Sequence, residues 1–399
     1  MTKTKTAWVG TDEAIALLGV SRATLYAYVS RGRVRSEAVP GGNRRSRYSR
    51  DDLERLVARS RERGNPAKAA EQALHWGLPI LESKITLIAD EHIYYRGRDA
   101  SELARSCSLA EVAALLWTGA MDGSGTLLPP VRAARMRVAD TDGPFVPAAQ
   151  AALAVAAAAD PLAFDLRPRA VVQTGWRIVW LLARVAAGAK AAGDSVDATL
   201  AAAWGVPRAV DLVRAALILS ADHELNVSTF TARCVASAGG SPYGVVVAGL
   251  AALEGTRHGG TTARIEASWE ALRRSRDVRG ALADKLRRGE AIEGFGHRLY
   301  AQGDPRAAVL LDLLPSSKTG AFARELAAAA RHVLGEAPTV DFALVAVART
   351  LGLPNGAALA LFAIGRTIGW LAHALEQYEE AAIIRPRAKY VGEAPAARA

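Results

Sequence analysis

Apolar residues recur every three or four positions from about residue 100 onward, the spacing of helices that bury at least one face. Glycine and proline interrupt this pattern at intervals that suit helix ends. Only residues 85–95 alternate as paired strands do, which predicts one small hairpin. We therefore predict an all-α body, with helices over residues 109–118, 148–159, 169–187, 208–221, 242–253, 320–333, 342–351 and 356–379.

The first sixty residues follow a different pattern, of short helices and a basic hairpin. Thr11, Ser21 and Ser49 suit N-caps, because their hydroxyl oxygens accept hydrogen bonds from the free N–H groups of a first helical turn. Two short helices around a glycine-containing turn are typical of a helix-turn-helix. The pattern predicts helices over residues 12–18, 22–30 and 50–60, and a β-hairpin wing over residues 33–48 with its turn at 40–43.

A chain of 399 residues is long enough for two or three domains with a large core. The run Gly64-Asn65-Pro66 breaks the third predicted helix. We expect a small winged helix-turn-helix domain over residues 1–62, a linker over 63–75 and a helical domain over 76–399.

Composition is typical of a soluble globular protein, since half of the residues are apolar and the mean hydropathy is +0.08. No apolar stretch reaches the length of about 18 residues that spans a membrane, so we expect no membrane segment. The basic N-terminus lacks the apolar region of a secretory signal. Cys107 and Cys234 are too few for a disulfide framework, which favours a cytoplasmic protein.

Positive charge is concentrated near the N-terminus. Residues 1–66 hold 14 Lys+Arg and 7 Asp+Glu, a balance of +7, whereas the other 333 residues hold 36 and 33, a balance of +3. This asymmetry favours an acidic partner for the N-terminal part, and nucleic acid is the first candidate. The alternative is a solvated basic fold that contacts protein or nothing.

The N-terminal pattern resembles the winged helix-turn-helix of MerR and excisionase proteins. This resemblance implies that double-stranded DNA is a partner of residues 1–62. The residues it places toward DNA are Arg22, Thr24 and Tyr28 on the second helix, and Arg44, Arg45 and Arg47 on the wing.

Three histidines and one aspartate lie in distinctive short segments. His223 lies in D-H-E-L-N-V-S-T, His258 in G-T-R-H-G-G, His297 in G-F-G-H-R-L-Y and Asp341 in P-T-V-D-F-A-L. A neutral imidazole can donate a hydrogen bond to a developing oxyanion, and a carboxylate can accept a proton. Two such imidazoles and one carboxylate suffice to form a carbon–carbon bond through an enol. The other histidines lack such surroundings, and we expect them to be structural or surface residues: His75, His92, His332 and His373.

These segments occur in an order and at spacings that resemble the citrate synthase family over roughly the last four-fifths of the chain. The resemblance also includes Y-R-G-R-D at residues 95–99, Gly365-Arg366, and Arg385-Pro386-Arg387. It implies a large helical domain with a smaller one inserted over about residues 259–345. It also implies a homodimer with shared active sites.

The implied activity is that of a citrate (Si)-synthase-like acyltransferase, which condenses acetyl-CoA with oxaloacetate to give citrate and CoA. Propionyl-CoA, with 2-methylcitrate as product, is a close variant, because one methylene changes binding by only about 1–3 kcal/mol. Neither a metal nor a permanently bound cofactor is expected. The alternative function is a DNA-binding transcriptional regulator that uses this body as a metabolite sensor.

The resemblance also implies a role for each matched residue. His258 would hydrogen-bond the thioester oxygen, Asp341 would remove the methyl proton, and His297 would polarise the ketone. The residues implied to bind the oxoacid are His223, Arg306, Arg366 and Arg385, the last reaching into the neighbouring subunit. Those implied to wrap CoA are Ala291, Ile292, Glu293, Gly294 and Phe295.

The sequence departs from the family's pattern at positions that bear on CoA affinity and oxoacid choice. Glu293 replaces a proline, which adds negative charge beside a polyanionic ligand. Thr256-Arg257 and Thr261-Thr262 replace the usual neighbours of His258, and Ala301 replaces a basic residue.

Overall fold

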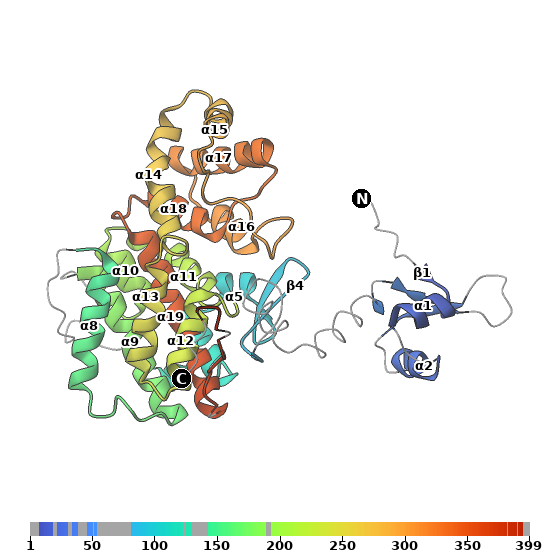
Figure 1. The fold of residues 1–399 in the computed structure, drawn as a ribbon. Coiled ribbons are helices and arrows are strands. Elements are labelled where there is room, and N and C mark those ends of the chain that lie inside the picture. Colours follow the sequence, from blue (N-terminus) through green and yellow to red (C-terminus); the bar gives the residue numbers. More distant parts are fainter. Residues whose placement is uncertain are drawn as a thin grey trace. The chain divides into compact units, whose positions relative to one another are not determined.

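The computed structural model of the chain describes residues 8–18, 22–30, 34–38, 46–50, 52–53, 81–122, 124–128, 143–188, 193–380, 382–388 and 390–393. The chain divides into two compact units, Met1–Glu82 and Ser83–Ala399 (Figure 1). The predicted linker, 63–75, lies outside the described residues, so the predicted domain boundaries stay predictions.

The N-terminal unit joins two helices to a three-stranded antiparallel sheet. Its elements are α1 (Thr11–Leu18), α2 (Arg22–Ser30), β1 (Trp8–Val9), β2 (Ser36–Ala38) and β3 (Ser46–Ser49). The strand order is β1-β3-β2, with Trp8 opposite Ser49 and Ser36 opposite Tyr48. Its core consists of Val9, Ala14, Leu25, Val34, Tyr48 and Leu53.

The two helices lie where the sequence predicts them, but the first wing strand begins three residues later than the predicted start at residue 33. Val34 is instead buried in the core, and the Arg35 side chain and backbone N–H both donate to the Asp52 carboxylate, at 2.8 and 3.0 Å. The wing turn, Arg44, Arg45 and most of the predicted third helix lie outside the described residues.

The second unit is helical apart from a small antiparallel sheet of β4 (Thr86–Ala89), β5 (His92–Tyr95) and β6 (Arg98–Asp99). This confirms the all-α prediction and the hairpin at residues 85–95. The helices of its large lobe are α5 (Ala100–Ser106), α6 (Leu109–Thr118), α7 (Ser124–Leu127), α8 (Phe145–Ala159), α9 (Pro168–Ala187), α10 (Val196–Ala203), α11 (Val210–Leu219), α12 (Val227–Ser237), α13 (Pro242–Leu253) and α19 (Ala357–Glu380), with a 3-10 turn at Pro207–Ala209.

Helix α19 is the central helix of the large lobe, and α6, α9, α11, α12 and α13 pack around it. It is long and apolar enough to cross a membrane, but 94% of its most apolar 18-residue window is buried inside the fold. Its apolar character is thus explained by its position in the core.

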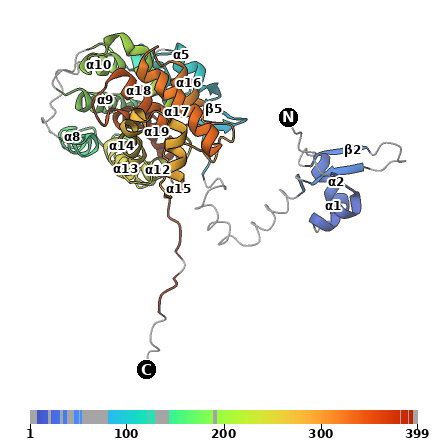
Figure 2. The same ribbon diagram turned by 90° about the horizontal axis from the view of Figure 1, so that it is seen from above.

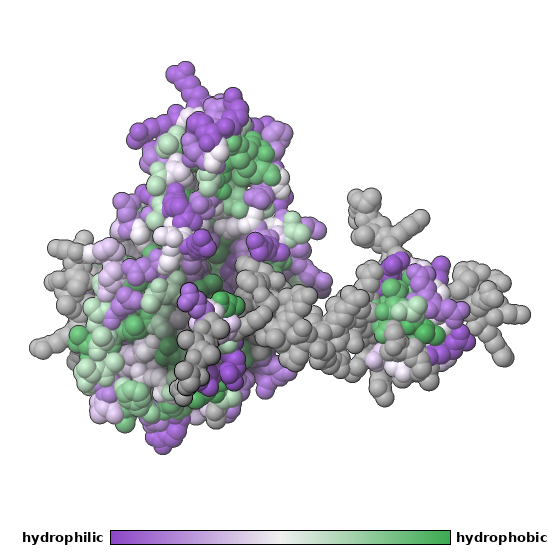
Figure 3. All heavy atoms as spheres, in the orientation of Figure 1, coloured by the Kyte–Doolittle hydropathy of each residue, from purple (hydrophilic) through white to green (hydrophobic). Residues whose placement is uncertain are grey.

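The small lobe consists of α14 (Gly260–Arg274), α15 (Val278–Arg287), α16 (Pro305–Asp312), α17 (Lys318–Leu334) and α18 (Val340–Leu351), which packs on α14, α16 and α17, and it stands above the large lobe in Figure 1. Hydrophilic side chains cover its far end, over α14 and α15 (Figure 3). Helix α18 returns the chain from this lobe to α19. The two lobes therefore meet where α14 and α16 begin and where α18 begins.

Candidate active site

The end of α11 lies unusually close to α19, and this contact positions His223. A Cβ atom on Gly365 would lie 2.3 Å from the Leu217 carbonyl oxygen, and one on Gly369 would lie 2.2 Å from that of Ala221. Only glycine allows this approach. The buried Tyr95 hydroxyl lies 3.1 and 3.2 Å from the carbonyl oxygens of Ile218 and Asp222 and so fixes the turn before His223.

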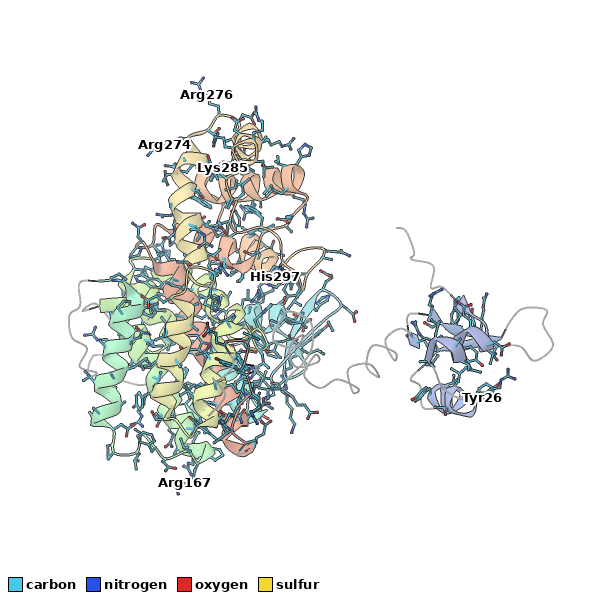
Figure 4. The ribbon with its side chains drawn as sticks, in the orientation of Figure 1. Tyr26, Arg167, Arg274, Arg276, Lys285 and His297 are labelled. Carbon is cyan, nitrogen blue, oxygen red and sulfur yellow. The ribbon has the colours of Figure 1, made fainter. Side chains whose placement is uncertain are left out.

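His223 and His297 face each other across the junction of the lobes. Their ring centroids are 5.2 Å apart, and His223 Nε2 lies 3.1 Å from the Tyr300 hydroxyl. His297, labelled in Figure 4, comes from the segment before α16. Its Nδ1 accepts the backbone N–H of Leu299 at 3.1 Å. A neutral His297 ring therefore carries its proton on Nε2, which is left to donate to a ligand.

Arg306 is buried at the start of α16 and held by Asp304, the N-cap of that helix. The pair is bidentate, with Arg306 Nε and Nη2 donating to the two carboxylate oxygens at 2.9 and 2.8 Å. Asp304 also accepts the backbone N–H of Val340 at 3.0 Å, which joins the start of α16 to the start of α18. Arg306 is thus oriented beside Asp341, the next residue of α18.

Arg366 is a buried cation that is only partly satisfied. Its Nε donates to the Ser220 carbonyl at 2.8 Å, and its guanidinium carbon lies 4.6 Å from the centre of the Phe362 ring. Its Nη1 is buried and has no hydrogen-bond partner among the described residues. Because a buried, unsatisfied charged donor is costly, this nitrogen indicates a place for an anionic ligand.

His258 precedes α14 and is oriented by Ser228 of α12. Its Nε2 lies 2.9 Å from the Ser228 hydroxyl, which also lies 2.8 Å from Asn226 Oδ1 and accepts the Trp370 indole N–H at 3.3 Å. The single hydroxyl proton of Ser228 has two acceptors within reach. When Ser228 donates to Nε2, His258 carries its proton on Nδ1 and can donate it to a ligand.

Asp341 lies in the first turn of α18, and its approach is tied to the segment 291–297. Thr339 N–H donates to the Gly294 carbonyl at 2.8 Å, and Gly296 N–H donates to the Ala337 carbonyl at 2.9 Å. Gly294 has a φ of +93°, and a Cβ atom there would lie 2.8 Å from the Ile265 side chain. The segment predicted to wrap CoA is therefore attached directly to the turn that carries Asp341.

Burial and the nearby arginines lower the pKa values of the three histidines, and burial raises the pKa of the Asp341 carboxylate. Burial, followed by the nearby Arg366, lowers the pKa of His258 to about 4. Burial, followed by Arg306, also lowers the pKa values of His297 and His223. Burial raises the pKa of Asp341 to about 6, although Arg306 opposes this. At pH 7 the site thus holds neutral imidazoles and a largely ionised base.

The other residues predicted for this site lie outside the cluster or at its edge. Ala291, Ile292, Glu293 and Phe295 line a small cavity together with residues of α14, α17 and α18. Arg385 is exposed on the C-terminal segment, which leaves the helical body (Figure 2).

The described part of the N-terminal unit includes four of the residues predicted to face DNA. Tyr28 is half-buried against the N-terminal core, whereas Tyr26 on the same helix is 51% exposed (Figure 4). Thr24 is half-buried. Arg22 pairs with Asp12 at 2.8 Å, and Arg47 pairs with Glu37 at 2.6 Å. Tyr26 is thus more exposed than Tyr28 on α2, and the predicted DNA contacts stay predictions.

The remaining histidines are placed as expected where they are described. His373 is fully buried, His332 is exposed, and His92 pairs at the surface with Asp99 at 3.0 Å. His75 lies outside the described residues. Within the described ranges, no group of three His, Cys, Asp or Glu side chains is placed to hold a metal.

Sequence reasoning did not single out four residues that orient the cluster, namely Ser228, Tyr300, Asp304 and Asp222. Each lies inside a segment that was already noted for its histidine or arginine. The available signal was therefore their position beside those residues, but a serine, tyrosine or aspartate there is equally common in an ordinary turn or cap.

Comparisons with known protein families agree with this geometry. The family model "Citrate synthase, C-terminal domain" matches residues 73–387, and the model "Helix-turn-helix domain" matches residues 8–61. Citrate synthase of Haloferax volcanii is 38% identical over 192 residues, which is 45% of this chain and 49% of that protein. The 2-methylcitrate synthase of Shewanella oneidensis is 34% identical over 188 residues, or 45% and 50%. The chain thus spans about half the length of the curated relatives it matches.

Solved structures match over a longer part of the chain. The ternary complex of carboxymethyl coenzyme A and oxaloacetate with citrate synthase from Thermoplasma acidophilum has a TM-score of 0.70 at 25% identity, covering 82% of this chain and 98% of that one. Citrate synthase from Thermotoga maritima has a TM-score of 0.66 at 25% identity, covering 81% and 96%.

Proposed function

This chain belongs to the citrate synthase family, and from that premise we propose that it condenses acetyl-CoA with oxaloacetate to give citrate and CoA. It would thus be an acyltransferase of the tricarboxylic acid cycle that works in the cytoplasm. It would need no permanently bound cofactor, since both carbon donors arrive as substrates.

One observation carries this proposal: the buried guanidinium of Arg366 has an unsatisfied Nη1 in a cluster with Arg306 and neutral histidines. Oxaloacetate is a dianion with a ketone between its carboxylates. Arginine matches carboxylates with its fork of donors, and a neutral imidazole matches a ketone oxygen. The cluster thus offers the donors that this substrate requires.

The proposed chemistry assigns a proton transfer to Asp341 and to His297, and a hydrogen bond to His258. Asp341 takes a proton from the methyl carbon of acetyl-CoA while His258 donates a hydrogen bond to the thioester oxygen, which gives a hydrogen-bonded enolate. The enolate carbon bonds to the ketone carbon of oxaloacetate as His297 Nε2 gives its proton to the ketone oxygen. Water then hydrolyses the thioester and releases CoA. A neutral His258 suits this step because it stabilises the enolate without first protonating it.

The test is release of free CoA thiol from acetyl-CoA and from propionyl-CoA, each with oxaloacetate. We expect release with both donors, faster with acetyl-CoA. His297→Gln should reduce the rate about a hundredfold or more, the size of a general acid's contribution. His92→Gln, a surface histidine, is the matched control and should leave the rate unchanged. No CoA release from folded protein that binds oxaloacetate would rule out the condensing enzyme.

We further propose that the active unit is a homodimer in which Arg385 of each protomer completes the other's site. Its support is that Arg385 is exposed on the C-terminal segment and has no partner among the described residues. Mixing the inactive variants Asp341→Asn and Arg385→Ala should restore about a quarter of the wild-type rate, because half of the dimers are mixed and each has one intact site. No recovery from mixed dimers would show that Arg385 does not act across the interface.

A second function is favoured by the helix-turn-helix match at residues 8–61 and by the charge of +7 over residues 1–66. We propose that the N-terminal unit binds double-stranded DNA and that oxaloacetate binding to the helical body regulates this. DNA selection with the full chain, with and without oxaloacetate, should enrich a defined sequence. Tyr26→Ala should reduce that enrichment, and an unenriched pool with the wild-type chain would eliminate this function.

A further inference from the structure

Three of the departures from the family's pattern are joined in the structure by one side chain, Arg264 of α14. Its Nε donates to Glu293 Oε1 at 2.9 Å and its Nη2 donates to Thr261 Oγ at 3.2 Å. Its Nη1 donates to the carbonyl oxygen of Thr256. Positions that differ from the family one by one in the sequence thus form a single interacting group, which we call the Arg264 clasp.

The clasp connects two segments that carry the candidate chemistry. Thr256 and Thr261 lie on either side of His258, whereas Glu293 lies in the segment predicted to wrap CoA. That segment also packs on α14 through Gly294, which lies against Ile265, the neighbour of Arg264. One planar guanidinium with three directed hydrogen bonds fixes the separation of these segments more closely than a lysine would.

The clasp also changes the charge that a CoA molecule would meet. Glu293 by itself would place a carboxylate beside a ligand that carries several phosphate charges. Arg264 and Glu293 are 41% and 31% exposed and lie within ion-pair distance, so each largely cancels the other's charge toward the solvent. The glutamate is therefore compatible with CoA only while Arg264 is paired with it.

We propose that Arg264 is a positioning residue for the acyl-CoA substrate, with two separable effects. Its fork of hydrogen bonds holds His258 at a fixed distance from the CoA segment, and its charge neutralises Glu293. This inference rests on the proposed function, because it takes CoA as the ligand of segment 291–295. The first effect acts on kcat and the second on CoA affinity.

The experiment measures the Kd of CoA by calorimetry, and kcat and the KM of acetyl-CoA by thiol release, in the full chain. Arg264→Gln should weaken CoA binding about fivefold, the size of a partly exposed charge interaction. It should lower kcat about tenfold or more, because His258 loses its fixed position. Adding Glu293→Gln should restore CoA affinity but leave kcat low. Arg264→Lys should keep CoA affinity and have a low kcat.

Arg273→Gln provides the matched control, since Arg273 lies on the same helix in an exposed ion pair with Glu270 at 2.9 Å. It should leave the Kd of CoA and kcat unchanged, and each variant's melting temperature reports whether it is folded. The proposal is overturned if folded Arg264→Gln matches the wild type in both quantities. It is also overturned if the Glu293→Gln addition restores no affinity, or if wild-type protein does not bind CoA.

Failure of the proposed function gives a different result. Calorimetry with CoA needs neither oxaloacetate nor turnover. Wild-type protein that binds CoA but releases none from acetyl-CoA would contradict the condensation reaction, while the affinity pattern of the four variants would still support or overturn the clasp.

Discussion

Replacing Asp341 by asparagine should stabilise the fold at neutral pH and remove most of the condensing activity. The carboxylate lies in the cluster beside Arg306 and Arg366, yet among the described residues no other side chain hydrogen-bonds to it. Burial is the largest influence on it and raises its pKa from the ordinary value of 3.8 to about 6. Asparagine has the same shape and no charge, so the substitution removes the ionised form and keeps the packing.

The size of the stability change follows from that pKa. Each tenfold change in proton affinity corresponds to about 1.4 kcal/mol, so the ionised carboxylate destabilises the folded protein by at most about 3 kcal/mol. The folded state binds this proton more tightly than the unfolded state does. Wild-type stability therefore falls as the pH rises from about 4 to about 6, and it is lowest above that range. The variant lacks this fall, so its advantage should be largest at pH 8 and nearly absent at pH 4.

The assay is urea unfolding followed by tryptophan fluorescence at pH 4.5 and pH 8, with thiol release as the activity measurement. At pH 8 we expect Asp341→Asn to be more stable by about 2–3 kcal/mol and at least about a hundredfold less active, as for loss of a general base. Asp304→Asn is the matched control, for which we expect the opposite change in the free energy of unfolding. Burial alone would raise the pKa of Asp304, but its ion pair with Arg306 holds that pKa below its ordinary value, so this variant should be less stable. A less stable Asp341→Asn at pH 8 would refute the reasoning.

Three further outcomes are expected. In a pH–rate profile of the wild-type protein, kcat/KM should decrease below about pH 6, because Asp341 becomes protonated there. Protonation of His258 should not cause this decrease, since its pKa is lowered to about 4. Arg366→Met should raise the KM of oxaloacetate about a hundredfold, the loss of a charge-assisted pair, and leave the KM of acetyl-CoA nearly unchanged in steady-state kinetics. Ser228→Ala should lower kcat about tenfold with little change in either KM, because one neutral hydrogen bond that orients His258 is lost.

The sequence predicted helix bounds best where the spacing of apolar residues agrees with the residues that cap or end a helix. Helices α6 and α13 have the bounds predicted from it, because Ser108 and Ser241 cap them and their apolar runs are long. Helix α14 was not delimited, since it begins at Gly260 and continues through two threonines and several charges. Its position depends on packing against α18, a contact between residues far apart in the chain that local periodicity does not contain.

The same difference applies to the candidate site. The segments of the histidines, of Asp341 and of Arg306 were predicted from residue type and order, and the structure brings them together. The residues that orient them were not predicted, because orientation depends on distant pairs. Asp304 is one example, since it accepts from Val340 36 positions away, and Trp370 reaches Ser228 over 142 positions. From the sequence alone, the negative charge of Glu293 is unfavourable beside CoA. Only the structure shows that Arg264, 29 positions away, pairs with it.

The balance of buried charge adds a physical reason for the proposed dimer. Among the described side chains of one protomer, Arg306 is matched by Asp304, and the carboxylate that most stabilises the charge of Arg366 is Asp222. Asp341 adds a third acid, so two guanidiniums face three carboxylates before an oxaloacetate dianion enters. Such an excess of negative charge opposes binding unless another cation or a proton is supplied. A proton on Asp341 would disable the base. In the proposed dimer, Arg385 of the second protomer would supply that cation and leave Asp341 ionised as the base.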